Sequence, residues 1–199
     1  MEIQRVTRSL DSGMVEEAYR QGIFPMADTD LGVVTWHRPR RRAILPLESF
    51  HLSKSLARTI RRGGFEVTYG QDFKGVMAAC ADRETTWISH EFMEIYTQLH
   101  RAGKASSVEV WMEGVLVGGL YGVCLGGAFF AESKFHRVTD MSKVALAFLV
   151  RRLRERGFEL LEVQYLTDHL MQFGVVEVSH KEYMTRLGGA LELERRFAP

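Results

Sequence analysis

The stretch SSVEVWMEGVLVGGLYGVCLGGAFFAES, residues 106–133, decides the fold that the sequence predicts. Residues 106–112 and 115–123 form two strand-like segments on either side of a Glu-Gly turn, which is the pattern of a β-hairpin. Residues 127–133 continue the meander as a third strand. We therefore expect an antiparallel sheet at the centre of the protein.

The uncharged run 115–131 inside this stretch does not suit a membrane helix. It has 17 residues, of which five are glycine, whereas a spanning helix needs about 20 mostly apolar residues. The glycines instead fit positions of strand twist or close packing. The N-terminal segment MEIQRVTRSLD has no apolar core of a secretory signal. We therefore expect a cytoplasmic protein without membrane contact.

The segments around the meander predict an α+β chain. Helices are expected over 12–21, 53–62, 72–80, 90–102, 140–156, just before Phe173 and from Ser179, with strands over 65–69, 158–165 and 175–178. Residues 26–50, which contain two prolines, are expected to be irregular. This order predicts a small N-terminal domain over 1–60 and a larger domain over 61–199, built on a mostly antiparallel mixed sheet flanked by helices.

The composition excludes several classes of protein but conceals an uneven charge. With 46% hydrophobic and 26% charged residues the chain is globular, and two cysteines cannot form a disulfide framework or a zinc site. The net charge of +1 argues against a nucleic-acid partner. However, the segment 37–62 carries eight Lys or Arg and one acid. This basic segment, with Trp36 beside it, favours binding to a phosphate backbone with stackable bases.

Three polar side chains follow apolar strand segments and are candidates for chemistry. Glu162 and Gln164 would share one face of the predicted strand 158–165, and Glu132 ends the strand that contains Phe129 and Phe130. A buried carboxylate is costly unless it is paired or used in function, so either a satisfied structural pair or a polar site fits the pattern. Motifs for nucleotide hydrolysis, zinc peptidases and serine hydrolases are absent from the sequence.

Motifs along almost the whole chain resemble those of the leucyl/phenylalanyl-tRNA–protein transferases. They are Tyr19-x-x-Gly-Ile-Phe-Pro, Trp36-x-x-Pro, RAILP at 42–46, FHxSKSL at 50–56, TWI at 86–88, SVEVW at 107–111, LVGGLYG at 116–122, ESxF at 132–135, SK at 142–143 and QxxTxHL at 164–170. Each motif is weak alone, but their order and number are specific.

This resemblance implies an activity and a fold. Members move Leu or Phe, and less readily Met, from an aminoacyl-tRNA to the α-amine of proteins with N-terminal Arg or Lys, which marks those proteins for degradation by the bacterial N-end rule pathway. The larger domain is similar to acyl-CoA N-acetyltransferases. No metal, ATP or coenzyme is implied, which agrees with an ester substrate that is already activated. A monomer is expected.

The resemblance also assigns roles to individual residues. Glu162 would orient or deprotonate the amine, Gln164 would position the ester or the proton path, and Glu132 would lie near the aminoacyl group. The terminal adenine would stack on Trp36. The remaining aminoacyl-tRNA contacts would come from Tyr19, Trp87 and Tyr96 and, for the acceptor-stem phosphates, from Lys54, Arg58, Arg61 and Arg62. Lys134 and Phe135 would lie at the amino-acid pocket.

Three positions depart from the pattern of the family. Glu162 stands where Asp is usual, Lys134 where Met is usual, and Thr167 where Asn is common. An ammonium in an apolar pocket is costly, so either Lys134 points outward or the pocket has changed. Near the acceptor, Lys134 would repel a basic N-terminus and favour an acidic or neutral one. These departures leave the transferred amino acid and the acceptor open.

Two other functions compete with this reading. An acyl-CoA-dependent N-acetyltransferase would need a glycine-rich pyrophosphate loop before the long helix, and the segment 136–143 contains no glycine. A non-enzymatic RNA-binding module would explain the basic segment and Trp36, but it would leave Glu132, Glu162 and Gln164 without a role.

Overall fold

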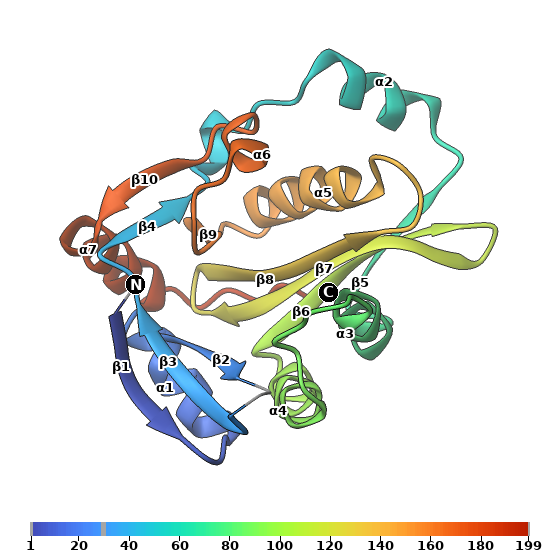
Figure 1. The fold of residues 1–199 in the computed structure, drawn as a ribbon. Coiled ribbons are helices and arrows are strands. Elements are labelled where there is room, and N and C mark those ends of the chain that lie inside the picture. The colour runs from blue at the N-terminus through green and yellow to red at the C-terminus, as the bar shows by residue number, and fades with distance from the viewer. Residues whose placement is uncertain (1, 29–30, 199) are drawn as a thin grey trace.

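The computed structural model describes residues 2–28 and 31–198, and within them two sheets form the protein (Figure 1). The smaller sheet has three antiparallel strands in the order β1-β3-β2 and carries one helix. Its elements are β1 (Glu2–Thr7), α1 (Ser12–Arg20), β2 (Phe24–Asp28) and β3 (Val33–Arg38). The last strand of this sheet in the chain, β3, ends at Arg38.

The larger sheet has seven strands in the order β10-β4-β9-β8-β7-β6-β5. All neighbours are antiparallel except β8 and β9, so the expected mostly antiparallel mixed sheet is confirmed. Its strands are β4 (Arg41–Ile44), β5 (Glu66–Tyr69), β6 (Ala105–Met112), β7 (Val115–Leu125), β8 (Ala128–His136), β9 (Leu160–Glu162) and β10 (Val176–Ser179). The predicted meander is the central part, β6-β7-β8.

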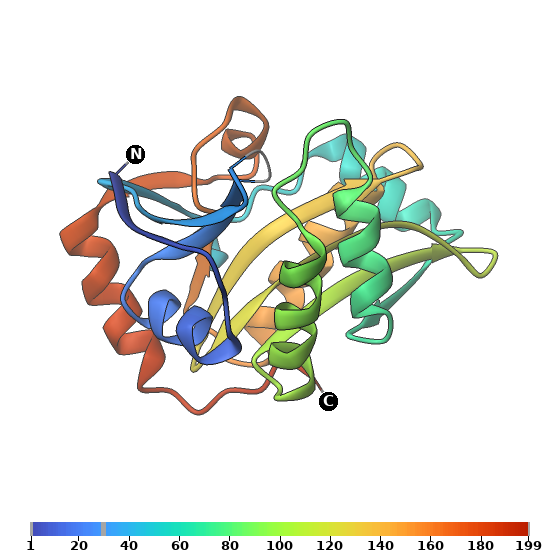
Figure 2. The ribbon, with the colours of Figure 1, turned by 60° about the horizontal axis from the view of Figure 1, so that its bottom comes forward.

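Helices cover both faces of the larger sheet, and the sheet separates two apolar cores (Figure 2). One face packs against α3, α4 and the smaller sheet, and the other packs against α5, on which α2 lies. The helices are α2 (Lys54–Arg62), α3 (Phe73–Ala81), α4 (His90–Arg101), α5 (Met141–Glu155), α6 (Asp168–Met171) and α7 (His180–Leu191), with a 3₁₀ turn η1 (Leu47–Ser49). The expected α+β class is confirmed.

Side-chain caps explain where several predicted helices begin. Ser53, Asp72 and Ser179 each accept a hydrogen bond from a backbone N–H in the first turn of α2, α3 and α7. These bonds satisfy donors that a helix N-terminus leaves without a partner. Local sequence therefore determined these helix starts correctly.

The prediction that residues 26–50 are irregular is wrong. This segment completes β2 and contains β3, β4 and the 3₁₀ turn. The two prolines of this segment lie outside the strands, since Pro39 separates β3 from β4 and Pro46 precedes the 3₁₀ turn. The partners of β4 are β9 and β10, more than a hundred residues later in the chain, so no local pattern announces this strand.

The predicted strand 158–165 is also shorter than expected, because regular pairing ends at Glu162. Gln164 has φ of 63°, in the left-handed region that non-glycine residues rarely adopt. The alternation of faces therefore stops before Gln164. Phe158 likewise packs in the core opposite to that of Leu160, although both were expected on one face.

One glycine of the meander sets the distance between the sheet and α5. A Cβ atom on Gly118 would lie 2.5 Å from Cβ of Met141, in the first turn of α5. The helix can approach the strand this closely only because position 118 has no side chain. The expected close-packing role is confirmed here.

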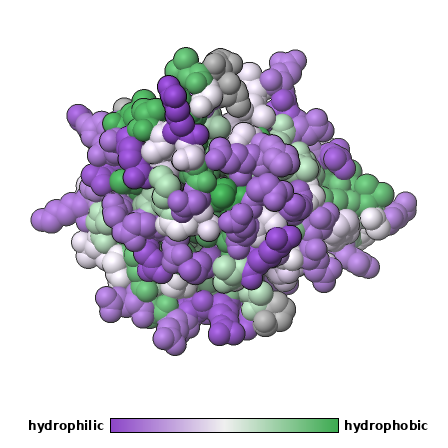
Figure 3. Space-filling model, turned by 90° about the horizontal axis from the view of Figure 1, so that it is seen from below, coloured by the Kyte–Doolittle hydropathy of each residue, from purple (hydrophilic) through white to green (hydrophobic). Residues whose placement is uncertain are grey.

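Within the described residues, no helix combines the length and apolar character that crossing a membrane requires. The face drawn in Figure 3 carries mainly hydrophilic side chains, and hydrophobic residues appear there as separate patches.

Candidate active site

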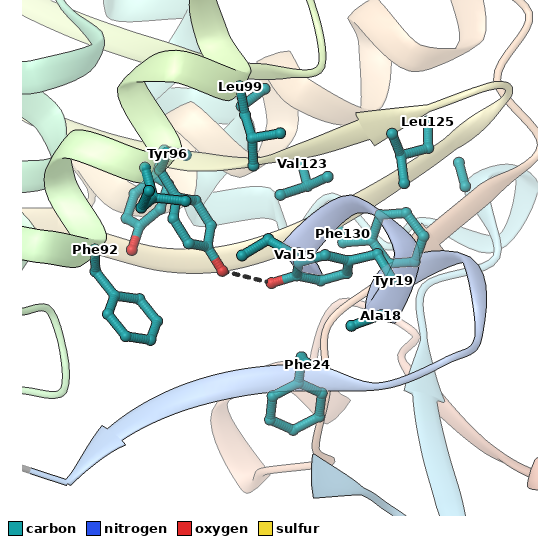
Figure 4. Packing of buried hydrophobic residues seen from close by; sticks show 14 of the residues in the cluster. Val15, Ala18, Tyr19, Phe24, Phe92, Tyr96, Leu99, Val123, Leu125 and Phe130 are labelled. Atoms are coloured by element: carbon teal, nitrogen blue, oxygen red, sulfur yellow. Dashed lines mark hydrogen bonds between the residues drawn. The ribbon is translucent and has the colours of Figure 1, made fainter. Parts of the chain in front are cut away.

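Two buried tyrosines and a glutamate meet between the smaller sheet and the larger one. The Tyr19 hydroxyl of α1 lies 2.8 Å from that of Tyr96 of α4, among the rings of Phe24, Phe92 and Phe130 (Figure 4). The same Tyr19 hydroxyl donates a hydrogen bond of 2.5 Å to Oε1 of Glu132 in β8. Three elements distant in sequence thus bring together three of the predicted site residues.

A β-bulge turns Glu132 toward these tyrosines. Tyr121 of β7 pairs with Ser133 and Gly122 pairs with Ala131, so Glu132 is an extra residue in β8. Bulges change the direction of a side chain and often lie beside functional sites. The bulge therefore places a carboxylate at the end of an otherwise apolar strand segment.

Gln164 joins Glu132 to the second carboxylate. Its side-chain amide donates to Oε2 of Glu132 at 3.2 Å, and its backbone N–H donates to Oε1 of Glu162 at 2.6 Å. The positive φ of Gln164 turns the chain out of the strand, so that its backbone N–H reaches Glu162 and its side-chain amide reaches Glu132. The three predicted catalytic residues are thus connected, but through the backbone of Gln164 rather than a shared strand face.

Arg42 is the last member of a polar chain, by which we mean the connected side chains of Tyr19, Glu132, Gln164, Glu162 and Arg42. The sequence analysis counted Arg42 only as part of the basic segment. Its Nε lies 3.2 Å from Oε1 of Glu162, and neither side chain has exposed area. The guanidinium also donates to the Gly22 carbonyl at 3.1 Å and to the Tyr183 hydroxyl at 3.2 Å, and it lies over the Phe24 ring. The one sequence signal for its burial is the apolar Ala-Ile-Leu that follows it.

The electrostatics of the two carboxyl groups differ. Burial raises the pKa of Glu132 to about 8, although the hydrogen bonds from Tyr19 and Gln164 act in the opposite direction. Burial also raises the pKa of Glu162, and the Arg42 guanidinium counteracts it. Glu132 therefore titrates near neutral pH, whereas Glu162 is held in a buried ion pair.

A small apolar cavity opens beside Glu132. Its volume is about 110 Å³, and it is lined by Leu120, Ala131, Glu132, Ser133, Lys134, Leu146, Val163 and Leu170. Of the two carboxylates Glu132 and Glu162, Glu132 lines this cavity and Glu162 does not. The cavity can accept an aliphatic or aromatic side chain while a polar group attached to it faces Glu132.

Lys134 lines this cavity, whereas Phe135 does not. Phe135 is a buried core residue that borders the neighbouring hollow. The Nζ atom of Lys134 is buried and has no hydrogen-bond partner among residues 2–28 and 31–198. Burial lowers the pKa of Lys134 to about 8, and nearby Lys143 adds to this effect. Of the two alternatives for Lys134, an outward ammonium or a changed pocket, the buried Nζ atom favours the changed pocket.

The two tryptophans of the predicted tRNA contact form no hydrogen bond with these polar side chains. Trp36 is 1% exposed, donates from Nε1 to Thr7 at 3.0 Å and lies under the Arg5 guanidinium, 4.5 Å from the ring centroid. Trp87 is half-buried and packs edge-on against Phe92. An adenine could stack on Trp36 only after Arg5 moves.

The basic segment 37–62 does not form one surface. Arg42 is buried, and Arg40 and Arg41 pair with Glu2 and Glu177. Four cations on α2 are exposed and form no ion pair with the described residues: Lys54, Arg58, Arg61 and Arg62. The four cations predicted to contact phosphates are therefore exposed and unpaired in the described chain, whereas Arg38, which also forms no ion pair there, is half-buried.

Comparison with known proteins gives a consistent result. The model of the family "Leucyl/phenylalanyl-tRNA protein transferase" matches residues 44–188, and the model of its N-terminal domain matches residues 8–40. A leucyl/phenylalanyl-tRNA–protein transferase of Gloeobacter violaceus is 51% identical and covers 95% of this chain and 98% of its own. One of Rubrobacter xylanophilus is 53% identical, with 93% and 97% covered.

A solved structure, a GCN5-related N-acetyltransferase from Kribbella flavida, is 14% identical with a TM-score of 0.46 over 82% of this chain and 60% of that one. The two family models together span nearly the whole chain, and the identity of the relatives extends over both sheets. The chain belongs to the leucyl/phenylalanyl-tRNA–protein transferase family.

Proposed function

We propose that this protein transfers Leu or Phe from a charged tRNA to the α-amine of proteins that begin with Arg or Lys. The observation that carries the proposal is the position of Glu132 at the wall of the apolar cavity, held by Tyr19 and Gln164. An aminoacyl ester whose side chain occupies the cavity would present its carbonyl to this carboxylate.

Glu132 is the group that we assign to proton transfer. The α-amine nitrogen attacks the ester carbonyl carbon, a C–N bond forms, and the bond to the ribose oxygen of the tRNA breaks. The carboxylate of Glu132 accepts the proton of the amine and returns it to the ribose oxygen. A pKa of about 8 suits this exchange, because an α-amine has an ordinary pKa of about 7.7–8.0.

Glu162 and Gln164 have positioning roles in this proposal. Glu162 has no exposed area and binds Arg42, so it acts on the reaction through the backbone of Gln164. Gln164 in turn holds Oε2 of Glu132. This differs from direct deprotonation by Glu162, which the family resemblance suggested. The longer side chain of Glu162, compared with Asp, is accommodated within the ion pair.

The exposed cations of α2 are assigned to the tRNA. Lys54, Arg58, Arg61 and Arg62 are free to neutralise backbone phosphates without reading sequence. Trp36, Trp87 and Tyr96 stay predictions as contacts for the aminoacyl-adenosine end.

The test is transfer from a panel of charged tRNAs to a peptide beginning with Arg, measured for the wild type and two variants. Glu132→Gln keeps the size and loses the proton acceptor, so we expect kcat to fall about 10²–10⁴-fold. Glu159→Gln, at an exposed position just before β9, is the matched control and should leave kcat unchanged. Absence of transfer from every charged tRNA contradicts the proposed function, and full activity of Glu132→Gln contradicts the role of Glu132.

A further inference from the structure

A second and larger hollow, bordered by several charged residues, adjoins the apolar cavity. Its volume is about 700 Å³, and Lys134 lines both spaces. Four cationic and two acidic side chains border it, together with two histidines. These are Arg83, Lys134, Arg137, Lys143, Asp82, Asp140, His136 and His169. The hollow therefore has a net positive lining immediately beside the proposed aminoacyl site.

Among the described residues, Lys143 is the one cation of this hollow with an acidic partner, and Lys134 is the one whose charged atom makes no hydrogen bond. Arg83 donates to the Lys134 carbonyl and to Ser133, and Lys143 pairs with Asp140 at 2.9 Å. The Nζ atom of Lys134, by contrast, is buried without a hydrogen-bond partner in the described chain. Its charged neighbour Lys143 repels it further. Buried charges in proteins are normally paired, so this arrangement lacks an anion.

We propose that the hollow binds a phosphodiester of the 3′ end of the aminoacyl-tRNA, with Lys134 as its principal cation. This inference rests on the proposed function. The phosphate of the terminal nucleotide is one ribose away from the ester bond, so a site that shares a wall with the amino-acid cavity lies within its reach. Both ribbon views also place α2, with its free cations, beside the start of α5, which borders the hollow (Figures 1 and 2).

The charge of the hollow distinguishes the phosphate from the acceptor protein. An N-terminal Arg or Lys would be repelled by Lys134 and Lys143, whereas a phosphodiester would neutralise them. The position of Lys134 in the wall also explains how a lysine can replace an apolar residue beside an apolar cavity, because its charge would be paired whenever the tRNA is bound. The alternative occupant is the carboxylate of an acidic acceptor N-terminus.

The first test measures binding by calorimetry, without any transfer step. The probes are 3′-deoxy-3′-leucylamino-adenosine, a non-hydrolysable analogue of the ester, and the same compound with a 5′-phosphodiester to cytidine. We expect the wild type to bind the phosphodiester compound about tenfold more tightly, a difference of about 1.4 kcal/mol. Lys134→Met should abolish this preference, whereas Lys181→Met, at an exposed position of α7, should retain it.

The second test uses complete charged tRNA and varies the salt concentration. Each single-stranded phosphate neutralised contributes about 0.7 to the slope of log K against log[salt]. Lys134→Met should reduce the slope by about this amount, and Lys181→Met should not. Because Met is close to Lys in length and removes a buried charge, the variant is expected to fold.

Two results overturn the inference. One is equal binding of the two adenosine compounds by the wild type, and the other is unchanged discrimination in Lys134→Met. A lower KM for Asp- or Glu-initiated peptides in the wild type than in Lys134→Met would assign the hollow to the acceptor instead. Wild-type transfer of Leu to an Arg-initiated peptide is measured in parallel, so that loss of the phosphate site is distinguished from failure of the proposed function.

Discussion

Replacement of Arg42 by Met tests the polar chain most directly. Arg42 and Glu162 form an ion pair with no exposed area, so solvent does not weaken it. Removing one partner of such a pair leaves an uncompensated buried charge and costs about 3–5 kcal/mol. For a chain of this size each kcal/mol lowers Tm by about 2–4 °C, so we expect Tm to fall by roughly 6–20 °C.

The neighbouring residue supplies the control. Arg41 pairs with Glu177, and the two side chains are 61% and 35% exposed, so Arg41→Met should cost less than about 1 kcal/mol. The double variant Arg42→Met/Glu162→Gln removes the uncompensated charge but keeps an oxygen that accepts from the backbone N–H of Gln164. It should therefore recover part of the loss, which a double-mutant cycle measures.

Chemical unfolding in urea, followed by circular dichroism at pH 7, gives the free energies for the five proteins that the comparison needs: the wild type, Arg42→Met, Glu162→Gln, the double variant and the control Arg41→Met. Transfer activity is measured at a temperature where each variant is folded, and kcat of Arg42→Met should fall while KM for tRNA stays constant, because Arg42 acts through Glu162 and Gln164. Equal stability losses for Arg42→Met and Arg41→Met would refute the reasoning.

Three further predictions concern single contacts. Glu132 keeps its proton up to a pH of about 8 in the folded protein but only to about 4.5 in the unfolded chain, so the folded state binds more protons between these values. The free energy of unfolding therefore falls as the pH rises, by up to about 1.4 kcal/mol per pH unit. Urea unfolding of Glu132→Gln from pH 5 to 8 should lack this fall. Tyr19→Phe removes a donor to the Glu132 carboxylate, so the apparent pKa in the pH profile of kcat should shift above about 8, and an unshifted profile would separate Glu132 from the measured titration. Gly118→Ala should destabilise the protein by about 1–3 kcal/mol by thermal unfolding, because its Cβ would collide with Met141, whereas Gly188→Ala, with open space around it, should not.

Local patterns in the sequence were sufficient for much of the secondary structure. The Glu-Gly turn and the flanking apolar segments predicted the β6-β7-β8 meander, and polar caps predicted the starts of α2, α3 and α7. These features depend on residues a few positions apart, which is why they can be read without the fold. Motifs along the chain also indicated the family, which the comparisons confirmed.

The strands of residues 24–44 could not be predicted in this way. β2 and β3 pair with each other and with β1, strands whose own sequence patterns are weak. β4 exists only because β9 and β10, far along the chain, flank it. The same limitation applies to Arg42. As part of a run of cations it suggested an exposed surface, and only the fold shows that it is buried against Glu162.

The sequence by itself determined which polar residues were candidates, since Glu132, Glu162 and Gln164 stand beside apolar segments. Only the tertiary structure decided their arrangement. A bulge in β8 turns Glu132 toward Tyr19, a left-handed residue at the end of β9 brings Gln164 to Glu132, and burial against Arg42 isolates Glu162. Exposure and charge pairing depend on which elements pack together, and that is a property of the whole fold rather than of any segment.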